Sequence, residues 1–275
     1  MITYRATLDV PRELVSFTAS LLAAERRRRG TPARSRALTC FWQAVLGLRW
    51  FRDRTAIGAL ARDHGISRAT AYRYVDEVTE VLAAEAPELP EALGQALAGG
   101  LAFVILDGKV IASDRCREQT RSVKGEAIDL WYSGKAHHHG GNIQAVARPD
   151  GFPLWLSPAE PGSVHDITAA RIHALPALYR AAALGLPTLA DPGYQGAGTG
   201  IKIPVKQPED GRELDLGNRS RNALQRSLRC LGERAFALLT QRWRALQHVT
   251  ASPSKITQIA RAALVLTHYE HGYTK

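Results

Sequence analysis

Three acidic residues lie far apart in the sequence but share features that suit metal-dependent chemistry. Asp107 follows the apolar run Leu101–Leu106, Asp191 ends a second apolar run in LADPGYQG, and Glu233 lies in a helical segment. Carboxylates are the hard oxygen ligands that Mg²⁺ prefers. Two such ions about 4 Å apart activate the attacking oxygen of a phosphodiester and neutralise the leaving one. Carboxylates that meet without metal repel one another, so a cluster of them indicates a functional site.

Each acid also has an ordinary structural interpretation. An Asp-Gly pair such as Asp107-Gly108 is a strong signal for a tight hairpin between two strands. Asp191 begins an Asp-Pro-Gly sequence that is typical of a turn. Glu233 follows Arg229 by four residues, a spacing that gives surface ion pairs worth about 0.2–0.5 kcal/mol on a helix. For any one of these acids the structural interpretation is sufficient. The presence of all three in one chain favours a role in metal binding.

The segments around these acids predict a mixed sheet covered by helices. The apolar run before Asp107 is rich in branched and aromatic residues and short for a helix, which is typical of a strand buried on both faces. Further strands are expected in IDLWYSGKA and GNIQAVARPDGFPLWLSP, with a hairpin at Asp150-Gly151. Residues 162–183 predict a loop and a crossover helix, and 218–247 a long helix that carries Arg226, Arg229 and Glu233 on one face. The predicted class is therefore α/β.

Nearer the N-terminus the sequence predicts a helix-turn-helix. Residues 35–51 carry apolar side chains at helical spacing, with Phe41 and Trp42 among the expected core. A short helix over 56–64, a turn at Gly65 and a second helix from the N-cap Ser67 to about 82 follow. The second helix would enter a major groove with the side chains of its first turns, Ser67, Arg68, Thr70, Tyr72 and Arg73. The alternative is a helical hairpin that binds nothing.

Composition agrees with a nucleic-acid partner. The 275 residues carry a net charge of +10 with a pI near 9.8, and an excess of Lys and Arg attracts polyanions. An arginine-rich surface can also accompany a GC-rich genome, and the run Arg26–Arg29 is expected to be a solvated face or a phosphate contact. Three scattered cysteines indicate a reducing compartment. No uncharged apolar run approaches the roughly 20 residues needed to cross a bilayer, so we expect a soluble cytoplasmic protein without a membrane partner.

A change of composition divides the chain. Residues 86–100 bring three acidic residues, two prolines and a Gly-Gly pair. We therefore predict an all-α DNA-binding domain over 1–86, a linker over 87–100 that can hold one short helix, and a catalytic domain over 101–275.

These motifs together resemble the DDE superfamily transposases of bacterial insertion sequences, whose catalytic domain has the ribonuclease H-like fold. The resemblance rests on ILDGK, YSGKAHHHGGNIQ, PGSVHDI, LADPGYQG and RCLGER, in which Arg229 and Glu233 match the family's arginine-glutamate spacing. It implies that Asp107, Asp191 and Glu233 are the catalytic metal ligands for two Mg²⁺ or Mn²⁺ ions. It also implies that Arg229 orients the glutamate or a phosphate.

The same resemblance implies an activity. The protein would bind the terminal inverted repeats of its element, cleave a phosphodiester to free a 3′ hydroxyl and join that end to target DNA, as a homodimer on DNA. Lys135 and Arg226 are expected to contact DNA. Two positions depart from the family pattern: Thr240 stands where a lysine is common, and Arg226 where a tyrosine is common. The alternatives are a catalytically inactive, transposase-derived DNA-binding regulator and a hydrolytic nuclease without strand transfer.

Two further sets of residues have a structural reading. Consecutive side chains in a strand point to opposite faces, so the run His137–His139 cannot converge on one ion. Asp166 in SVHD is expected to cap a helix, with an additional acid near the site as the lesser alternative.

Overall fold

The computed structural model describes residues 7–122, 125–208 and 213–273, without the side chain of Arg229. This part of the chain divides into two compact units. The N-terminal unit comprises residues 7–86 together with 239–247 and 258–273, and the sheet unit comprises 87–238 together with 248–257. The predicted DNA-binding domain, linker and catalytic domain over 1–86, 87–100 and 101–275 stay a prediction.

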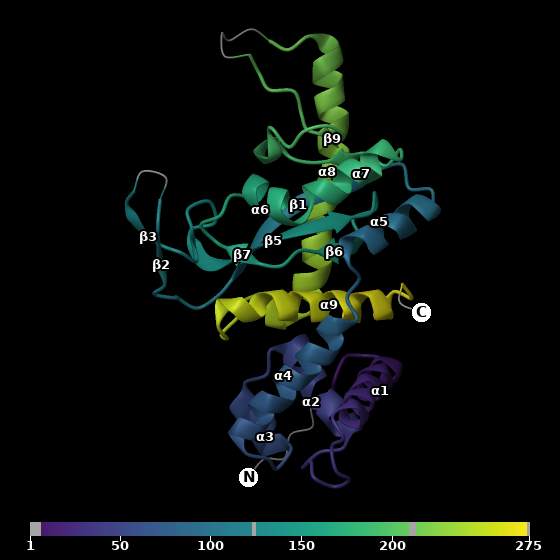
Figure 1. Cartoon of the computed structure of the whole chain (residues 1–275), viewed down its shortest axis with the longest axis vertical. Helices are drawn as coiled ribbons and strands as arrows, with labels where there is room; N and C mark the ends of the chain where they lie inside the picture. The colour runs from purple at the N-terminus through teal and green to yellow at the C-terminus, as the bar shows by residue number, and fades with distance from the viewer. Residues whose placement is uncertain (1–6, 123–124, 209–212, 274–275) are drawn as a thin grey trace. The chain divides into compact units, whose positions relative to one another are not determined.

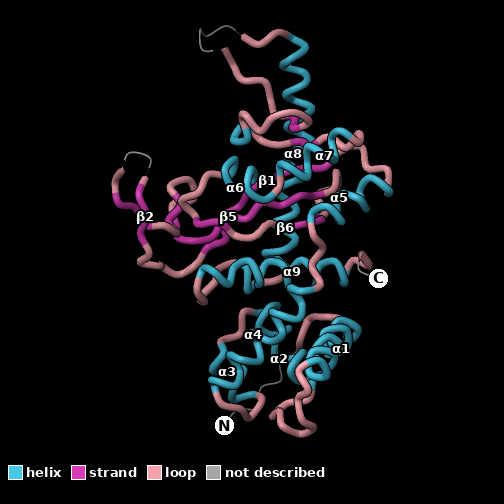
Figure 2. Tube along the Cα trace, viewed as in Figure 1, coloured by secondary structure: helices cyan, strands magenta, loops and turns pink. Residues whose placement is uncertain are grey.

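The N-terminal unit is helical (Figure 2). Its elements are α1 (Arg12–Arg28), α2 (Cys40–Asp53), α3 (Ile57–Asp63), α4 (Arg68–Ala84), the 3₁₀ turn η2 (Arg244–Leu246) and most of α9 (Ile256–Glu270). Helix α2 crosses α4 at Gly47, where an added Cβ would lie 2.6 Å from Val78 Cγ1. The close approach therefore depends on glycine. Phe41 and Trp42, predicted as core, are 36% and 52% exposed, so the prediction is wrong for these two; Leu48 and Phe51, which belong to the same predicted apolar spacing, are buried as expected, and Leu46 is buried with them.

The two helices predicted on either side of Gly65 are present as α3 and α4, and their role as a DNA-binding helix-turn-helix stays a prediction. Gly65 supplies the turn with a φ of 62°, a left-handed conformation that glycine adopts without strain. Ser67 caps α4 by accepting a 3.1 Å hydrogen bond from the backbone N–H of Thr70. The two helices pack around a cluster formed by Leu46, Leu60, Tyr74 and Val75, with Ile57 and Ile66 against it.

The C-terminal residues join this unit through specific contacts. The Trp243 indole N–H donates a 2.9 Å hydrogen bond to Thr267 Oγ1 inside the unit. The Arg242 guanidinium donates to Glu270 Oε1 at 2.6 Å and to Asp9 Oδ2 at 2.9 Å. Long-range packing of this kind leaves no local sequence signal, which explains why the predicted boundary placed these residues elsewhere.

The sheet unit holds a mixed sheet in the order β4-β5-β1-β8-β9, with β6 and β7 also paired to β5. Figure 1 labels β1, β5, β6, β7 and β9 of this sheet. The strands are β1 (Val104–Ala112), β4 (Tyr132–Ser133), β5 (His138–Ala147), β6 (Pro153–Leu156), β7 (Glu160–Pro161), β8 (Thr188–Leu189) and β9 (Ile201–Lys202). Strand β1 pairs antiparallel with β5 and parallel with β8, and β8 pairs parallel with β9. A separate two-stranded ribbon joins β2 (Gln119–Arg121) and β3 (Ala127–Asp129).

Helices flank this sheet. They are α5 (Leu89–Ala98), α6 (Asp166–His173), α7 (Leu175–Ala183) and α8 (Leu216–Arg242), of which the last four residues are counted in the N-terminal unit; the short turns are η1 (Pro192–Tyr194) and η3 (Pro253–Lys255). Helix α5 occupies most of the segment predicted as a linker and buries Leu89, Ala92, Leu93 and Ala96. The structure confirms the predicted fold class, a mixed α/β sheet with flanking helices after an N-terminal helical region.

Strand β1 is continuous through Asp107 and Gly108, so the hairpin alternative at this pair is wrong. Residues 104–112 form one strand, and Asp107 lies within it and not at its end. Gly108 is required by close packing and not by a turn, because an added Cβ would lie 2.7 Å from both Asp166 Oδ1 and Gln144 Nε2. The Asp150-Gly151 turn between β5 and β6 is present as predicted, with Phe152 N–H bonded to Asp150 Oδ1 at 3.0 Å.

Candidate active site

The parallel pairing of β1 and β8 brings the chain segments that carry Asp107 and Asp191 near each other. Ile105 pairs with Leu189 as the last pair of the two strands, and each aspartate lies two residues further along its own chain. Asp107 is still within β1, whereas Asp191 lies beyond the end of β8, at the start of the turn η1. Both residues are half-buried.

Asp191 is held in place by the turn that follows it. It caps η1, and its Oδ1 accepts a 2.8 Å hydrogen bond from the backbone N–H of Gly193. The sequence offered a turn and a metal ligand as alternatives for this residue. The two are compatible, because the capping bond uses one carboxylate oxygen and fixes the side chain beside β1.

Helix α8 brings Glu233 to the same face. An added Cβ on Gly232 would lie 2.8 Å from Ile105 Cγ2 and 3.6 Å from Asp107 Cβ, so the helix backbone lies directly against β1. One turn later, the Phe236 ring lies 5.9 Å from the Lys109 ammonium. Glu233 immediately follows the contact at Gly232, and its side chain is exposed.

The acidic side chains are nevertheless not gathered around a single point. Among the residues that the structure describes, no group of three or more His, Cys, Asp or Glu side chains could hold a metal ion. Asp107 and Asp191 each follow the last pair of β1 and β8 by two residues, and Glu233 is next to the contact of Gly232 with Asp107. The backbone thus brings the three residues to one region, whereas their carboxyl groups do not form a closed cage.

Asp166 lies on the other face of β1 and is not a helix cap. His165 occupies the N-cap position of α6, and Asp166 is the first residue of the helix. Its Oδ2 accepts a 2.6 Å hydrogen bond from Lys135 Nζ, and its Oδ1 accepts one of 2.8 Å from Asn142 Nδ2. The predicted capping role is therefore wrong, and the lesser alternative of an acid near the site is the one that the geometry supports.

These contacts belong to a longer chain of side-chain hydrogen bonds, which we call the Tyr194–Lys135 network. Asn142 Oδ1 accepts from Gln144 Nε2 at 2.9 Å, and Gln144 Oε1 accepts from the buried Tyr194 hydroxyl at 2.5 Å. Since Gln144 lies opposite Gly108, Tyr194 reaches across β1 to β5. The network therefore ties the turn that carries Asp191 to the middle of the sheet. Two amides at alternate positions of the apolar strand GNIQAVA were a signal that sequence reasoning missed.

Electrostatic effects connect both faces of β1. The pKa of Lys135 is raised, first by its hydrogen bond to Asp166 and also by the charges of Asp191 and Asp107. Burial, followed by the same three aspartates, raises the pKa of Tyr194 well above 10. One ammonium and one phenol thus lie within the field of all three carboxylates.

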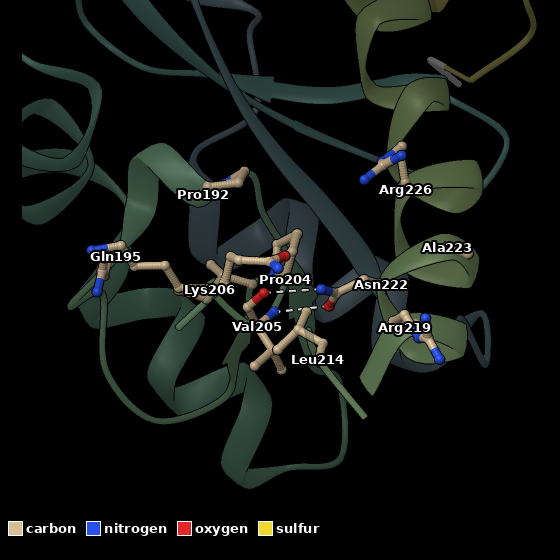
Figure 3. Close-up of a pocket in the computed structure, with 12 residues that line it drawn as sticks. Pro192, Gln195, Pro204, Val205, Lys206, Leu214, Arg219, Asn222, Ala223 and Arg226 are labelled. Atoms are coloured by element: carbon tan, nitrogen blue, oxygen red, sulfur yellow. Dashed lines mark hydrogen bonds between the residues drawn. The ribbon is translucent and has the colours of Figure 1, made fainter. Parts of the chain in front are cut away.

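A pocket of about 720 Å³ is lined in part by Pro192, the residue that follows Asp191 in the chain (Figure 3). Pro192 forms one wall, and α8 contributes Arg226. Asn222 fixes the opposite wall, since its side chain donates to Val205 O at 2.9 Å and accepts from Val205 N at 2.8 Å (Figure 3). No carboxylate of the described residues pairs with Arg226. Lys206 and Arg219 add further positive charge, although Arg219 pairs with Glu213 at 2.8 Å.

The predicted DNA-facing side chains of the N-terminal unit lie at the start of α4. Arg68, Tyr72 and Arg73 are exposed. The Arg68 guanidinium lies over the Tyr72 ring, 5.6 Å from the ring centre. The Arg73 guanidinium donates a 3.1 Å hydrogen bond to Thr70 Oγ1, which also lies 2.9 Å from Ser67 Oγ. The five side chains therefore form one continuous polar surface.

Other predicted positions have clear outcomes. The Arg26–Arg29 run ends α1 and is largely paired, with Arg28 and Arg29 bonded to Glu25. Two of the three consecutive histidines have hydrogen-bond partners. His139 Nε2 lies 3.3 Å from Asp129 Oδ2, and His138 Nδ1 lies 3.0 Å from the backbone oxygen of His139. Arg229 was predicted to orient Glu233 or a phosphate, and its side chain lies outside the part of the chain that the structure describes.

Comparison with known proteins shows the family to which the chain belongs. A family model described as DDE superfamily endonuclease matches residues 106–268, which is more than half of the chain. The comparisons with curated proteins and with solved structures return no match. Within the described residues, no helix combines the length and the apolar character needed to cross a membrane. The matched segment spans the mixed sheet and all three predicted acids, and the chain belongs to the DDE superfamily endonucleases, a family of transposase-like nucleases.

Proposed function

We propose that the protein is a DNA transposase that cleaves transposon ends in a divalent-metal-dependent reaction and transfers the freed strand into target DNA. The observation that supports this proposal is the parallel pairing of β1 and β8, whose last pair, Ile105 and Leu189, lies two residues before Asp107 and Asp191. The family membership supports nuclease chemistry on DNA. The proposal further includes a homodimer on DNA and a cytoplasmic location.

The donor set suits Mg²⁺ or Mn²⁺. Asp107 and Asp191 offer carboxylate oxygens from adjacent, half-buried positions, and Glu233 follows the point where α8 contacts β1. These hard oxygens are the ligands that small divalent cations prefer. Two bound ions would activate the attacking oxygen and neutralise the leaving oxygen of the phosphodiester. The positive charge would also offset the repulsion between the three carboxylates, so the exposed Glu233 side chain can close the site.

The surrounding residues hold the proposed metal ligands in place and bind the DNA strand. The Gly193 N–H and the Tyr194 hydroxyl hold the turn that carries Asp191, which keeps that carboxylate beside β1. Arg226 lies on the same helix as Glu233, two turns earlier, and lines the pocket next to Pro192. It can therefore bind the phosphate of a DNA strand that enters the site, a role that Lys135 can share from the other face of β1.

The helix-turn-helix supplies recognition in this proposal. The exposed polar surface of Ser67, Arg68, Thr70, Tyr72 and Arg73 lies on the first turns of α4. This is the part of a recognition helix that contacts base edges in a major groove. We therefore assign the terminal inverted repeats to this surface and the scissile phosphate to the sheet unit.

A cleavage assay on the DNA that flanks the native gene tests the proposal. We expect Mg²⁺-dependent nicks at the element ends and joining of those ends to a target plasmid. Asp107→Asn and Asp191→Asn should each lower cleavage by about a thousandfold, equal to about 4 kcal/mol of activation free energy. Asp150→Asn, in the exposed turn before β6, is the matched control and should leave cleavage unchanged. Cleavage retained by either site variant would refute the assignment.

A second candidate is a catalytically inactive regulator that only binds DNA. It is favoured by the observation that the described acidic side chains do not form a metal-binding group. The departures at Arg226 and Thr240 point in the same direction. A wild-type protein that binds the flanking repeats but neither cleaves them nor binds Mn²⁺ would establish this candidate.

A further inference from the structure

We propose that Lys135 is an internal counter-cation of the active site, and that a divalent cation entering the site displaces its ammonium from Asp166. This inference rests on the proposed function, because it concerns the same carboxylates. It assigns Lys135 a role in the metal-free protein that is separate from any contact with DNA.

The two partners of the Lys135–Asp166 ion pair differ in their exposure to solvent. Lys135 lies in the turn between β4 and β5, and its ammonium is 2.6 Å from Asp166 Oδ2. The lysine side chain is 71% exposed, whereas the aspartate side chain is 12% exposed. An exposed ammonium can exchange its partner at little cost, since solvent screens such pairs. The carboxylate cannot move away as easily.

Asp166 is fixed independently of the lysine. Asn142 Nδ2 donates to its other oxygen at 2.8 Å, and the backbone of Gly108 lies against the carboxylate. The amide of Asn142 is itself held by Gln144 at 2.9 Å. The negative charge of Asp166 therefore stays beside β1 after the ammonium has left.

The field at Lys135 comes from more than its direct partner. Asp166, Asp191 and Asp107 all act on the ammonium, in that order of influence, and raise its pKa. Asp107 and Asp191 are also the residues to which we assign the metal. A cation bound between them is repelled by the Lys135 ammonium, and the ammonium is repelled by the cation. The two positive charges therefore compete for one acidic region.

This competition has a second consequence. Once displaced, the ammonium on its exposed side chain is available to a DNA phosphate. Binding of the divalent cation and binding of DNA are then coupled, and the coupling must be equal in both directions.

Calorimetric titration of the full chain with MnCl₂, without DNA, tests the inference. Lys135→Met should raise the affinity for Mn²⁺ about fivefold and lower the melting temperature of the metal-free protein. Lys135→Arg keeps the charge and should bind Mn²⁺ as the wild type does. Arg180→Met removes one exposed positive charge from α7 and serves as the matched control, with unchanged affinity.

A double variant identifies the partner. In an Asp166→Asn background, Lys135→Met should no longer change the affinity for Mn²⁺. An unchanged or lower affinity in the single Lys135→Met variant, with binding still abolished by Asp107→Asn, would overturn this inference alone. Absence of Mn²⁺ binding by the wild type would overturn the proposed function and this inference with it.

Discussion

The helix-turn-helix surface and the acidic site are built in opposite ways. The five polar side chains of the first come from one stretch of seven residues and are held by a cap and by bonds to one another. The acids of the second come from positions 107, 166, 191 and 233 and are placed by strand register, a helix contact and the Tyr194–Lys135 network. The recognition surface therefore tolerates change around it, whereas the acidic site depends on packing at single atoms.

The largest effect is expected where that packing is tightest. Gly108→Ala places a methyl group 2.7 Å from Asp166 Oδ1 and Gln144 Nε2. Such overpacking costs about 3 kcal/mol of unfolding free energy. Urea unfolding of both proteins measures the difference. Gly134→Ala, whose added Cβ meets nothing within 4 Å, is the control and should unfold like the wild type.

A smaller loss is expected from the network. Tyr194→Phe removes the hydroxyl that donates to Gln144 Oε1 and leaves that buried oxygen without its donor. The cost of such a change is about 2 kcal/mol of unfolding free energy. Tyr132→Phe alters a tyrosine that is 39% exposed and should cost nothing measurable. Equal urea midpoints for the two variants would show that the network does not hold the turn.

A substitution on the exposed surface of α4 should change the affinity for DNA and leave the stability of the protein unchanged. Arg73→Ala removes an exposed guanidinium at the start of α4 and should weaken binding to the flanking repeats about tenfold, or about 1.4 kcal/mol. Fluorescence anisotropy with a labelled duplex measures this change. Arg12→Ala, at the exposed start of α1, is the charge-matched control. If both variants weaken binding equally, only the net charge matters and the assigned surface is wrong.

The smallest effect concerns pH in the N-terminal unit. The pKa of His64 is lowered, chiefly by burial and then by Arg49, and its Nε2 has no hydrogen-bond partner in the described chain. The unfolded chain therefore binds the proton more readily below about pH 6.5, and stability falls as the pH drops through that range. His64→Gln should show a smaller decrease in urea midpoint between pH 7.5 and 5.5. An identical decrease in the variant would contradict this origin.

Sequence reasoning succeeded where the determinants are local. The turn at Gly65, the cap at Ser67 and the hairpin at Asp150-Gly151 each depend on neighbouring residues, and their positions were predicted. The α/β class and several strand positions along the chain followed from apolar runs. Asp107 and Asp191 could be singled out because each follows such a run.

The remainder depends on contacts between distant residues. Asp166 carries the signal of a helix cap, and only the packing against Gly108 shows its place beside β1. Phe41 and Trp42 have the same helical spacing as the buried Leu48 and Phe51, yet both are exposed, and the buried Leu46 was not predicted. The C-terminal helix joins the N-terminal unit through pairs such as Trp243 and Thr267, which no local pattern reveals.

Anomalous diffraction from a crystal soaked in MnCl₂ tests the central claim most directly. We predict density for Mn²⁺ between the carboxylates of Asp107 and Asp191, with Glu233 turned toward it, at oxygen-to-metal distances of about 2.0–2.2 Å. Soaks of Asp191→Asn crystals should lose that density. Manganese bound elsewhere on the molecule, or no manganese at this edge of β1 in the wild type, would contradict the account.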